Sequence, residues 1–173
     1  MKILICGDVQ VGKSTLIKKL TADMGRVPRG YITKRIPAPE GETSFVYLYD
    51  IANPPEHIED SAIIKAIVPD GATDYPEVMD TLAVEYLDGI PEGELVILDE
   101  LGTLESKSPL FQKAVMDILG GNYDVLASVK AQNTDFLRAV RSHPDCELFI
   151  ITPKNRDELY DQLRSLVIHA ADK

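Results

Sequence analysis

Residues 7–14, which read GDVQVGKS, constrain the fold of this chain more than any other stretch. They match the pattern Gly-x-x-x-x-Gly-Lys-Ser/Thr in full. The short apolar run KILIC precedes them, and Leu16, Ile17 and Leu20 recur after them at helical spacing. A strand, a glycine-bearing loop and a helix in this order form a phosphate cradle, because glycine lets successive N–H groups turn inward and the helix adds its positive end. The stretch therefore predicts a nucleotide-phosphate site.

Individual positions of this loop have expected roles in binding a nucleotide. The Lys13 ammonium can reach the β- and γ-phosphates, the Ser14 hydroxyl can ligate Mg2+, and Thr15 is expected near the α-phosphate. The candidate nucleotide-binding residues of the loop are Gly7, Asp8, Val9, Gln10, Val11, Gly12, Lys13, Ser14 and Thr15. The implied substrate is a nucleoside triphosphate such as ATP or GTP.

Two adjacent carboxylates end a second apolar run, LVILDE at residues 95–100. Asp99 stands at the carboxyl end of the expected strand, where α/β proteins place ligands, so we expect it to bind Mg2+ through water. Glu100 would face the opposite side of a regular strand, but a turn of the chain there lets it orient or deprotonate an attacking water. The pair favours hydrolysis over transfer to a nucleoside.

Apolar runs alternate with helical patterns along most of the chain, which predicts an α/β fold with a largely parallel sheet. GYITKRI and SFVYLYDI flank the turn-rich PAPEGET and predict a β-hairpin. Residues 61–68 fit either a strand or a short helix, and a helix capped by Asp74 is expected over 74–89. With 173 residues and no repeat or linker, we expect a single domain spanning 1–173.

The charge balance argues against several partner classes. A net charge of −10 does not favour general attraction to nucleic acid or to an anionic membrane, although the basic stretch at 26–35 is an exception. No apolar run approaches the roughly 20 residues that span a bilayer, and the N-terminal run is too short for a signal peptide. Cys6 and Cys146 lie in or beside apolar runs, which suits reduced thiols. We expect a cytoplasmic protein.

Several polar residues have more than one interpretation. Asn155 and Arg156 follow the run ELFII and could contact a nucleobase, or serve as a helix cap and a surface charge. Arg35 is the candidate catalytic arginine that stabilises transition-state charge in cis, with Arg138 and Arg141 as alternatives. The catalytic set expected from the sequence is therefore Lys13, Glu100 and Arg35.

Four stretches together resemble the THEP1 family of small P-loop nucleoside-triphosphatases over nearly the whole chain: GDVQVGKST, RGYITK, VILDELGTLESKS and TPKNRDEL. The third is the most specific, because family members carry a similar Asp-Glu-x-Gly-x-x-Glu stretch, here Asp99, Glu100, Gly102 and Glu105. The resemblance implies a RecA-like three-layer sandwich with an added β-hairpin. It also implies Mg2+-dependent hydrolysis of ATP, GTP and other nucleoside triphosphates to diphosphates.

The chain departs from the family pattern at three places. Gln10 stands where family loops usually carry an extra glycine, and Lys34 and Arg35 stand where a more acidic stretch is expected. Lys130 ends the run VLASVK, where relatives tend to have histidine. It could sense the charge of a γ-phosphate or be a solvated strand-end lysine, and the second interpretation is slightly favoured.

Two other classes of function use the same cradle. A small-molecule or nucleotide kinase is one alternative, but the segment SHPDCE is short and acidic, unlike an arginine-rich lid. The other is a nucleotide-dependent switch or chaperone, whose unidentified protein partner would supply stimulation. Glu100 also weakens the kinase alternative, and the sequence lacks the base-specificity boxes of GTPases that would favour a switch.

Overall fold

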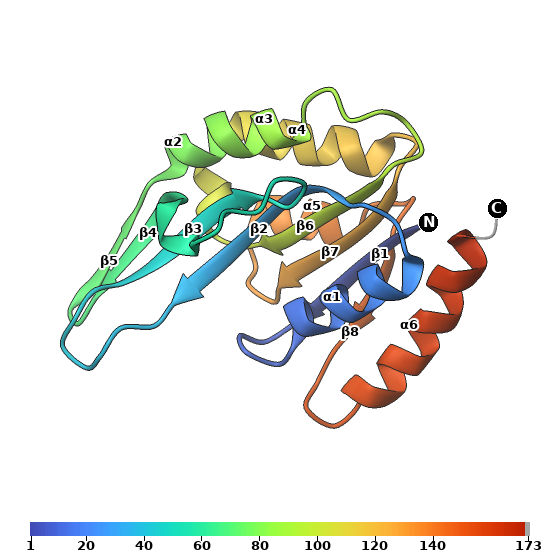
Figure 1. Ribbon diagram of the computed structural model, residues 1–173, viewed down its shortest axis with the longest axis horizontal. Helices are drawn as coiled ribbons and strands as arrows, with labels where there is room; N and C mark the ends of the chain where they lie inside the picture. Colours follow the sequence, from blue (N-terminus) through green and yellow to red (C-terminus); the bar gives the residue numbers. More distant parts are fainter. Residues whose placement is uncertain (172–173) are drawn as a thin grey trace.

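The fold is built on one sheet, which the computed structural model describes together with its helices for residues 1–171 (Figure 1). The strands are β1 (Lys2–Gly7), β2 (Arg29–Ile36), β3 (Ser44–Asp50), β4 (Ala62–Val68), β5 (Gly71–Asp74), β6 (Leu95–Leu101), β7 (Asp124–Lys130) and β8 (Glu147–Ile150). The helices are α1 (Lys13–Met24), α2 (Pro76–Val78), α3 (Val84–Leu87), α4 (Pro109–Gly120), α5 (Asp135–Arg141) and α6 (Arg156–Ala171), with the short turns η1 (Ile58–Asp60), η2 (Met79–Ala83) and η3 (Leu104–Lys107). No helix in this described part is long and apolar enough to cross a bilayer.

The sheet has eight strands in the order β5-β4-β3-β2-β6-β7-β1-β8. The strands from β2 to β8 in this order are parallel, whereas β3, β4 and β5 pair antiparallel. β1, β6 and β7 are buried on both faces, which explains why they read as continuous apolar runs. The carboxyl ends of these parallel strands meet at one edge, where open α/β sheets bind their ligands.

Alternate residues of β1, β2, β6 and β7 enter two cores, one on each face of the sheet. Leu4 shares one core with Leu98 and Phe111, beneath α3, α4 and α5, whereas Ile3 and Ile5 share the other with α1 and α6. Figure 1 shows the three layers, with α1 and α6 on one side of the sheet and α3 and α4 on the other. The predicted α/β class, with three layers and a mostly parallel sheet, is confirmed.

The added β-hairpin is present as β2 and β3, and it belongs to a larger antiparallel extension. Residues 62–68, which fitted either a strand or a helix in the sequence, form β4 against β3, and β5 pairs with β4. The extension reaches well beyond the helical layers at one end of the molecule (Figure 1). The hairpin is thus the first half of a four-stranded meander.

One seam joins this extension to the parallel strands. β2 pairs with β6 through four residue pairs, of which the last is Ile32 with Asp99. Gly30 lies in this seam at φ 103°, and a Cβ atom there would come within 2.3 Å of the Ile97 carbonyl oxygen. Only glycine combines this backbone conformation with so close an approach of the two strands.

The expected cap at Asp74 is wrong. Asp74 ends β5, and its carboxylate accepts ion pairs from the ammonium groups of Lys65 and Lys107, each at 3.0 Å. The helical segment begins at Pro76, with Tyr75 before it. A carboxylate between two lysines is already satisfied, so it stays in the strand instead of turning to cap the helix.

Candidate functional site

The loop between β1 and α1 is organised around the Lys13 ammonium. Lys13 is 5% exposed, and its Nζ donates to the carbonyl oxygens of Gly7 at 2.9 Å and Asp8 at 2.7 Å. Gly12 adopts φ 108° and Gln10 adopts φ 63°, so two residues of the loop lie in the left-handed region. This backbone reverses direction around the lysine, as a phosphate cradle requires. The glycine expected from the family pattern at position 10 is replaced here by a residue that accepts the same conformation at a cost.

Ser14 and Asp99 meet at the start of α1. The Ser14 hydroxyl donates to Asp99 Oδ1 at 3.0 Å, and the Ser128 hydroxyl from β7 donates to the same oxygen. Asp99 is 2% exposed. Burial raises the pKa of its carboxyl, while the hydroxyls of Ser128 and Ser14 act in the opposite direction. The two residues predicted to hold a metal therefore lie within hydrogen-bond distance.

These two side chains fit a magnesium ion. A carboxylate and a hydroxyl are the oxygen ligands that Mg2+ prefers, and the ion keeps its other positions for substrate phosphate oxygens and water. Within residues 1–171, no group of three or more His, Cys, Asp or Glu side chains is arranged to hold a metal. Ser14 and Asp99 would therefore supply two oxygen ligands to such an ion, with phosphate oxygens and water as the others.

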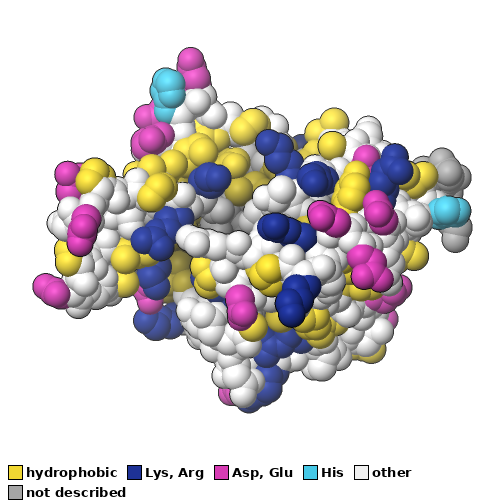
Figure 2. All heavy atoms as spheres, turned by 90° about the horizontal axis from the view of Figure 1, so that it is seen from below, with side chains coloured by type: hydrophobic (Ala, Val, Ile, Leu, Met, Phe, Trp, Pro, Cys, Tyr) yellow, Lys and Arg dark blue, Asp and Glu magenta, His cyan; other side chains and the backbone are white. Residues whose placement is uncertain are grey.

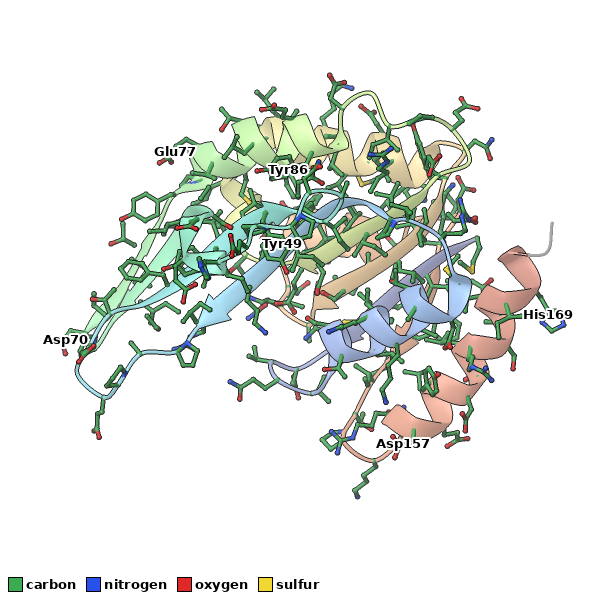
Figure 3. The ribbon with its side chains drawn as sticks, viewed as in Figure 1. Tyr49, Asp70, Glu77, Tyr86, Asp157 and His169 are labelled. Carbon is green, nitrogen blue, oxygen red and sulfur yellow. The ribbon has the colours of Figure 1, made fainter. Side chains whose placement is uncertain are left out.

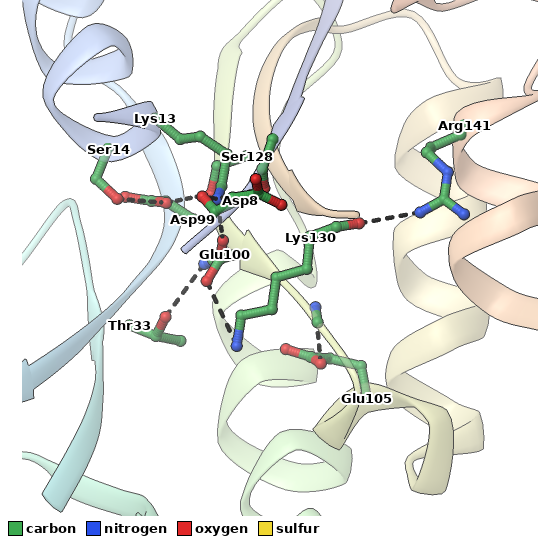
Figure 4. A network of polar contacts seen from close by, with 12 residues as sticks. Asp8, Lys13, Ser14, Thr33, Asp99, Glu100, Glu105, Ser128, Lys130 and Arg141 are labelled. Atoms are coloured by element: carbon green, nitrogen blue, oxygen red, sulfur yellow. Dashed lines mark hydrogen bonds and ion pairs between the residues drawn. The ribbon is translucent and has the colours of Figure 1, made fainter. Parts of the chain in front are cut away.

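Glu100 lies beside the cradle lysine. Its Oε1 is 3.0 Å from Lys13 Nζ, its Oε2 is 3.6 Å from Lys130 Nζ, and its backbone N–H donates to Thr33 Oγ1 at 3.2 Å (Figure 4). The pairing of β6 with β7 shifts register between Leu98 and Leu101, so the regular alternation of side chains breaks at the Asp-Glu pair. Both carboxylates consequently face the loop.

Two residues of the site were missed or left open by the sequence. No role was predicted for Ser128, because a serine inside the apolar run VLASVK is typical of a small residue tolerated in a strand. Lys130 forms an ion pair with Glu100, which replaces the favoured interpretation of a solvated lysine. Both residues reach the site because β7 lies between β1 and β6. Local sequence patterns do not reveal this strand order, so they gave no sign of either contact.

Glu105 forms a buried carboxyl group behind this arrangement. It is 3% exposed on η3, and its Oε2 accepts the Gly102 backbone N–H at 2.9 Å (Figure 4). Burial raises the pKa of the Glu105 carboxyl from 4.5 to about 7, against the opposing charge of Lys130. The Asp-Glu-x-Gly-x-x-Glu stretch therefore closes on itself, with its last carboxylate holding the loop that follows β6.

The structure places the candidate arginines away from the cradle lysine. The Arg35 guanidinium donates to Ser44 Oγ at 3.1 Å within the hairpin. Arg138 pairs with Asp135 on the surface of α5. Arg141 donates to the carbonyl oxygens of Lys130 at 3.0 Å and of Gln132 at 2.9 Å, and so fixes the loop after β7. A catalytic role for Arg35 stays a prediction.

Two pockets flank the loop on opposite sides. The first, of about 240 Å3, is lined by Gly7, Asp8, Val9, Lys130, Ala131 and Gln132. The second, of about 250 Å3, is lined by Gly12, Thr15, Leu16, Lys19, Ile151, Arg156, Asp157 and Tyr160. The second pocket lies between the N-terminal ends of α1 and α6, and Figure 3 shows Asp157 at that start of α6.

For Asn155 and Arg156 the sequence allowed either contact with a nucleobase or roles as a helix cap and a surface charge, and the two residues differ in which of these their contacts fit. The Asn155 side chain accepts from the Thr152 backbone N–H at 2.7 Å and donates to the Ile150 carbonyl oxygen at 2.9 Å. It is therefore occupied in shaping the turn before α6. Arg156 is exposed and lines the second pocket together with Thr15. Contact with a nucleotide thus stays a prediction for both, and the geometry suits Arg156 better.

Comparison with known proteins shows the family and the fold of this chain. The profile of the NTPase family matches residues 2–164. The nucleoside-triphosphatase THEP1 of Thermotoga maritima is 29% identical over 170 residues, covering 96% of this chain and 95% of the relative. THEP1 of Aquifex aeolicus is 26% identical over 177 residues, covering 96% of this chain and 99% of the relative.

Solved structures show the same architecture. The crystal structure of THEP1 from the hyperthermophile Aquifex aeolicus superposes with a TM-score of 0.75 at 23% identity, covering 96% of this chain and 99% of that one. The solution structure of a human cancer-related nucleoside triphosphatase gives 0.73 at 18% identity, covering 96% of each chain. By its sequence and its fold, this chain belongs to the NTPase family that includes the THEP1 nucleoside-triphosphatases.

Proposed function

We propose that this protein is a Mg2+-dependent nucleoside-triphosphatase that converts ATP, GTP and other nucleoside triphosphates to diphosphate and phosphate. The observation that carries the proposal is the position of the Glu100 carboxylate, which lies 3.0 Å from the Lys13 ammonium. Glu100 also directly follows Asp99, which accepts the Ser14 hydroxyl. A second carboxylate at this point has no role in binding a phosphate anion. It suits a group that orients or deprotonates water.

The arrangement of the site gives the substrate a direction. Lys130 lines the first pocket and forms an ion pair with Glu100, so the γ-phosphate belongs on that side of the loop. The nucleoside then leaves the loop on the opposite side, past Thr15 and into the second pocket beside Arg156. Lys19 lies over the Tyr160 ring there, 5.2 Å from its centroid, and both side chains line the pocket that would receive the base.

The electrostatics of this surface suit an anionic substrate. Although the chain carries a net charge of −10, Lys and Arg side chains are frequent across the middle of the face in Figure 2. A local cluster of cations in an acidic protein attracts a triphosphate without attracting nucleic acid over the whole surface. This distribution supports a small anionic substrate.

The chain's own residues supply most of the chemistry. Glu100 orients a water whose oxygen attacks the γ-phosphorus, and the bond from that phosphorus to the β–γ bridging oxygen breaks. The water proton passes to Glu100 and on to solvent or product phosphate. Lys13 and the loop N–H groups stabilise charge on the transferred group. Mg2+, held by Ser14 and Asp99, would neutralise phosphate charge.

Phosphate release from ATP, GTP, CTP and UTP, with and without Mg2+ and with no added acceptor, tests the proposal. We expect release from all four nucleotides by the wild type and loss in Lys13→Ala. The Glu100→Gln variant should still bind nucleotide but lose at least about 100-fold in rate. Lys113→Met, a charge removal on the far surface of α4, serves as the control.

The result that would contradict the proposal is binding of Mg2+-nucleotide by the wild type with no phosphate release. A phosphoryl acceptor would then be needed, as in a kinase, or a protein partner, as in a switch. Unchanged turnover in Glu100→Gln would remove the assigned role of that carboxylate alone.

A further inference from the structure

Glu100 lies between two lysines that come from different elements. Lys13 begins α1, Lys130 ends β7, and each contacts a different oxygen of the Glu100 carboxylate, at 3.0 Å and 3.6 Å respectively (Figure 4). Glu100 is therefore shared between the lysine that binds phosphate and a second lysine outside the loop. Hydrolysis requires this carboxylate near water, and not on the lysine that the phosphates need.

The Lys13 ammonium already has three oxygen partners in this arrangement. Its Nζ donates to the carbonyl oxygens of Gly7 and Asp8 and forms an ion pair with the Glu100 carboxylate. A bound phosphate takes the place of one of these partners. The carbonyls belong to the backbone of the loop, whereas Glu100 can leave by rotating its side chain. Glu100 and the phosphates thus compete for the same cation.

Lys130 is placed to receive the displaced carboxylate. Arg141 donates to the Lys130 carbonyl oxygen at 3.0 Å and so fixes its backbone. The Lys130 side chain packs against Gly102, where an added Cβ would lie 3.0 Å from Lys130 Cδ. Its ammonium lines the first pocket and is already within 3.6 Å of Glu100. A lysine held in this way has little freedom left to lose when Glu100 transfers to it.

We infer that Lys130 is a positioning residue, which takes over Glu100 when the nucleotide phosphates take Lys13. The transfer couples binding to catalysis, because arrival of the phosphates moves the water-orienting carboxylate from Lys13 to its working position on the side of the first pocket. The inference rests on the proposed function and adds a residue to it. It also predicts that Lys130 acts on the nucleotide only through Glu100.

A double-mutant cycle on nucleotide binding tests this dependence. The change Lys130→Met keeps the length of the side chain and removes its charge, and it is made in the wild type and in Glu100→Gln. Affinity is measured for β,γ-imido-ATP with Mg2+. We expect Lys130→Met to weaken binding about threefold in the wild type, the effect of one partly exposed ion pair, and to have no effect in the Glu100→Gln background.

The rate supplies the second measurement. In the otherwise wild-type protein, Lys130→Met should lower kcat about tenfold, and Lys130→Arg should restore both kcat and affinity. Lys113→Met is the matched control, since it removes the same charge from the surface of α4. Thermal melting of each variant shows whether it folds, and a variant with reduced stability but unchanged cycle values would argue for a structural role and against the inference.

The outcomes separate this inference from the proposed function. Equal weakening of binding in both backgrounds would mean that Lys130 contacts the phosphate directly, which overturns the transfer. Wild-type hydrolysis with an unaffected Lys130→Met variant would overturn the positioning role alone. Absence of phosphate release from the wild type would overturn the proposed function, and the inference with it.

Discussion

Replacing Glu105 by glutamine should change how stability depends on pH. The carboxyl group is 3% exposed and its Oε2 accepts one backbone hydrogen bond, from Gly102. Burial raises its pKa to about 7, from 4.5. The folded state therefore holds this proton more tightly than the unfolded chain does. The stabilisation that results is fully present below pH 4.5 and is lost as the pH rises through 7.

The size of this effect follows from the two pKa values. With about 1.4 kcal/mol for each pKa unit, the full difference between 4.5 and about 7 amounts to about 3.5 kcal/mol of unfolding free energy. Between pH 5 and pH 8 the wild type should lose about 2.5 kcal/mol through this group. Glutamine is neutral throughout and can still accept the Gly102 N–H, so the Glu105→Gln variant lacks this dependence.

Urea denaturation followed by circular dichroism, at several pH values from 5 to 8, measures the free energy of unfolding of both proteins. Subtracting the variant from the wild type removes the titration of all other groups. We expect the difference to fall with rising pH. Glu77→Gln, an exposed change at the start of α2 (Figure 3), controls for the substitution itself. Parallel wild-type and Glu105→Gln curves would refute the reasoning.

Three further predictions concern packing, the β2–β6 seam and the hairpin arginine. Phe111→Ala should cost about 3–5 kcal/mol in a urea titration, because the ring is fully buried and packs edge-on against Tyr31 with centroids 5.5 Å apart. Gly30→Ala should cost at least about 2 kcal/mol, whereas Gly25→Ala, also at positive φ but with open space around its Cβ, should cost about 1 kcal/mol. Equal losses at the two glycines would contradict the close approach at Ile97. Arg35→Ala should lower kcat far more than nucleotide affinity, and equal loss of both would exclude a transition-state role.

The phosphate cradle and the fold class could be predicted from the sequence because both depend on local patterns. The loop carries its chemistry in eight consecutive residues, and the flanking strand and helix show their periods within a few residues of it. The alternation of apolar runs and helices predicted the parallel sheet in the same way. The family resemblance, which the comparisons confirm, rests on this loop and on three further short stretches, RGYITK, VILDELGTLESKS and TPKNRDEL.

The contacts that complete the site depend on strand order, which local periodicity does not encode. Ser128 reaches Asp99, and Lys130 reaches Glu100, because β7 lies between β1 and β6. Asp74 shows the same limitation on the other side of the molecule. Its sequence context is that of a helix cap, but in β5 it pairs with Lys65 on the neighbouring strand and with Lys107, which is distant in sequence. Charge pairing across the sheet and with a distant lysine prevailed over the local preference for a cap.

The antiparallel extension joins the parallel strands through the pairing of β2 with β6, so a movement of the extension is transmitted to the site through this seam. The seam ends with the pairing of Ile32 and Asp99, and the next residue along β2, Thr33, accepts the Glu100 backbone N–H. A shift of β2 along this line reaches Asp99 and Glu100, the carboxylates proposed to bind Mg2+ and to orient water, before any residue of the phosphate loop. Force applied to the projecting strands would thus act on these two carboxylates first, and on Ser14 and Lys13 only through their contacts with them.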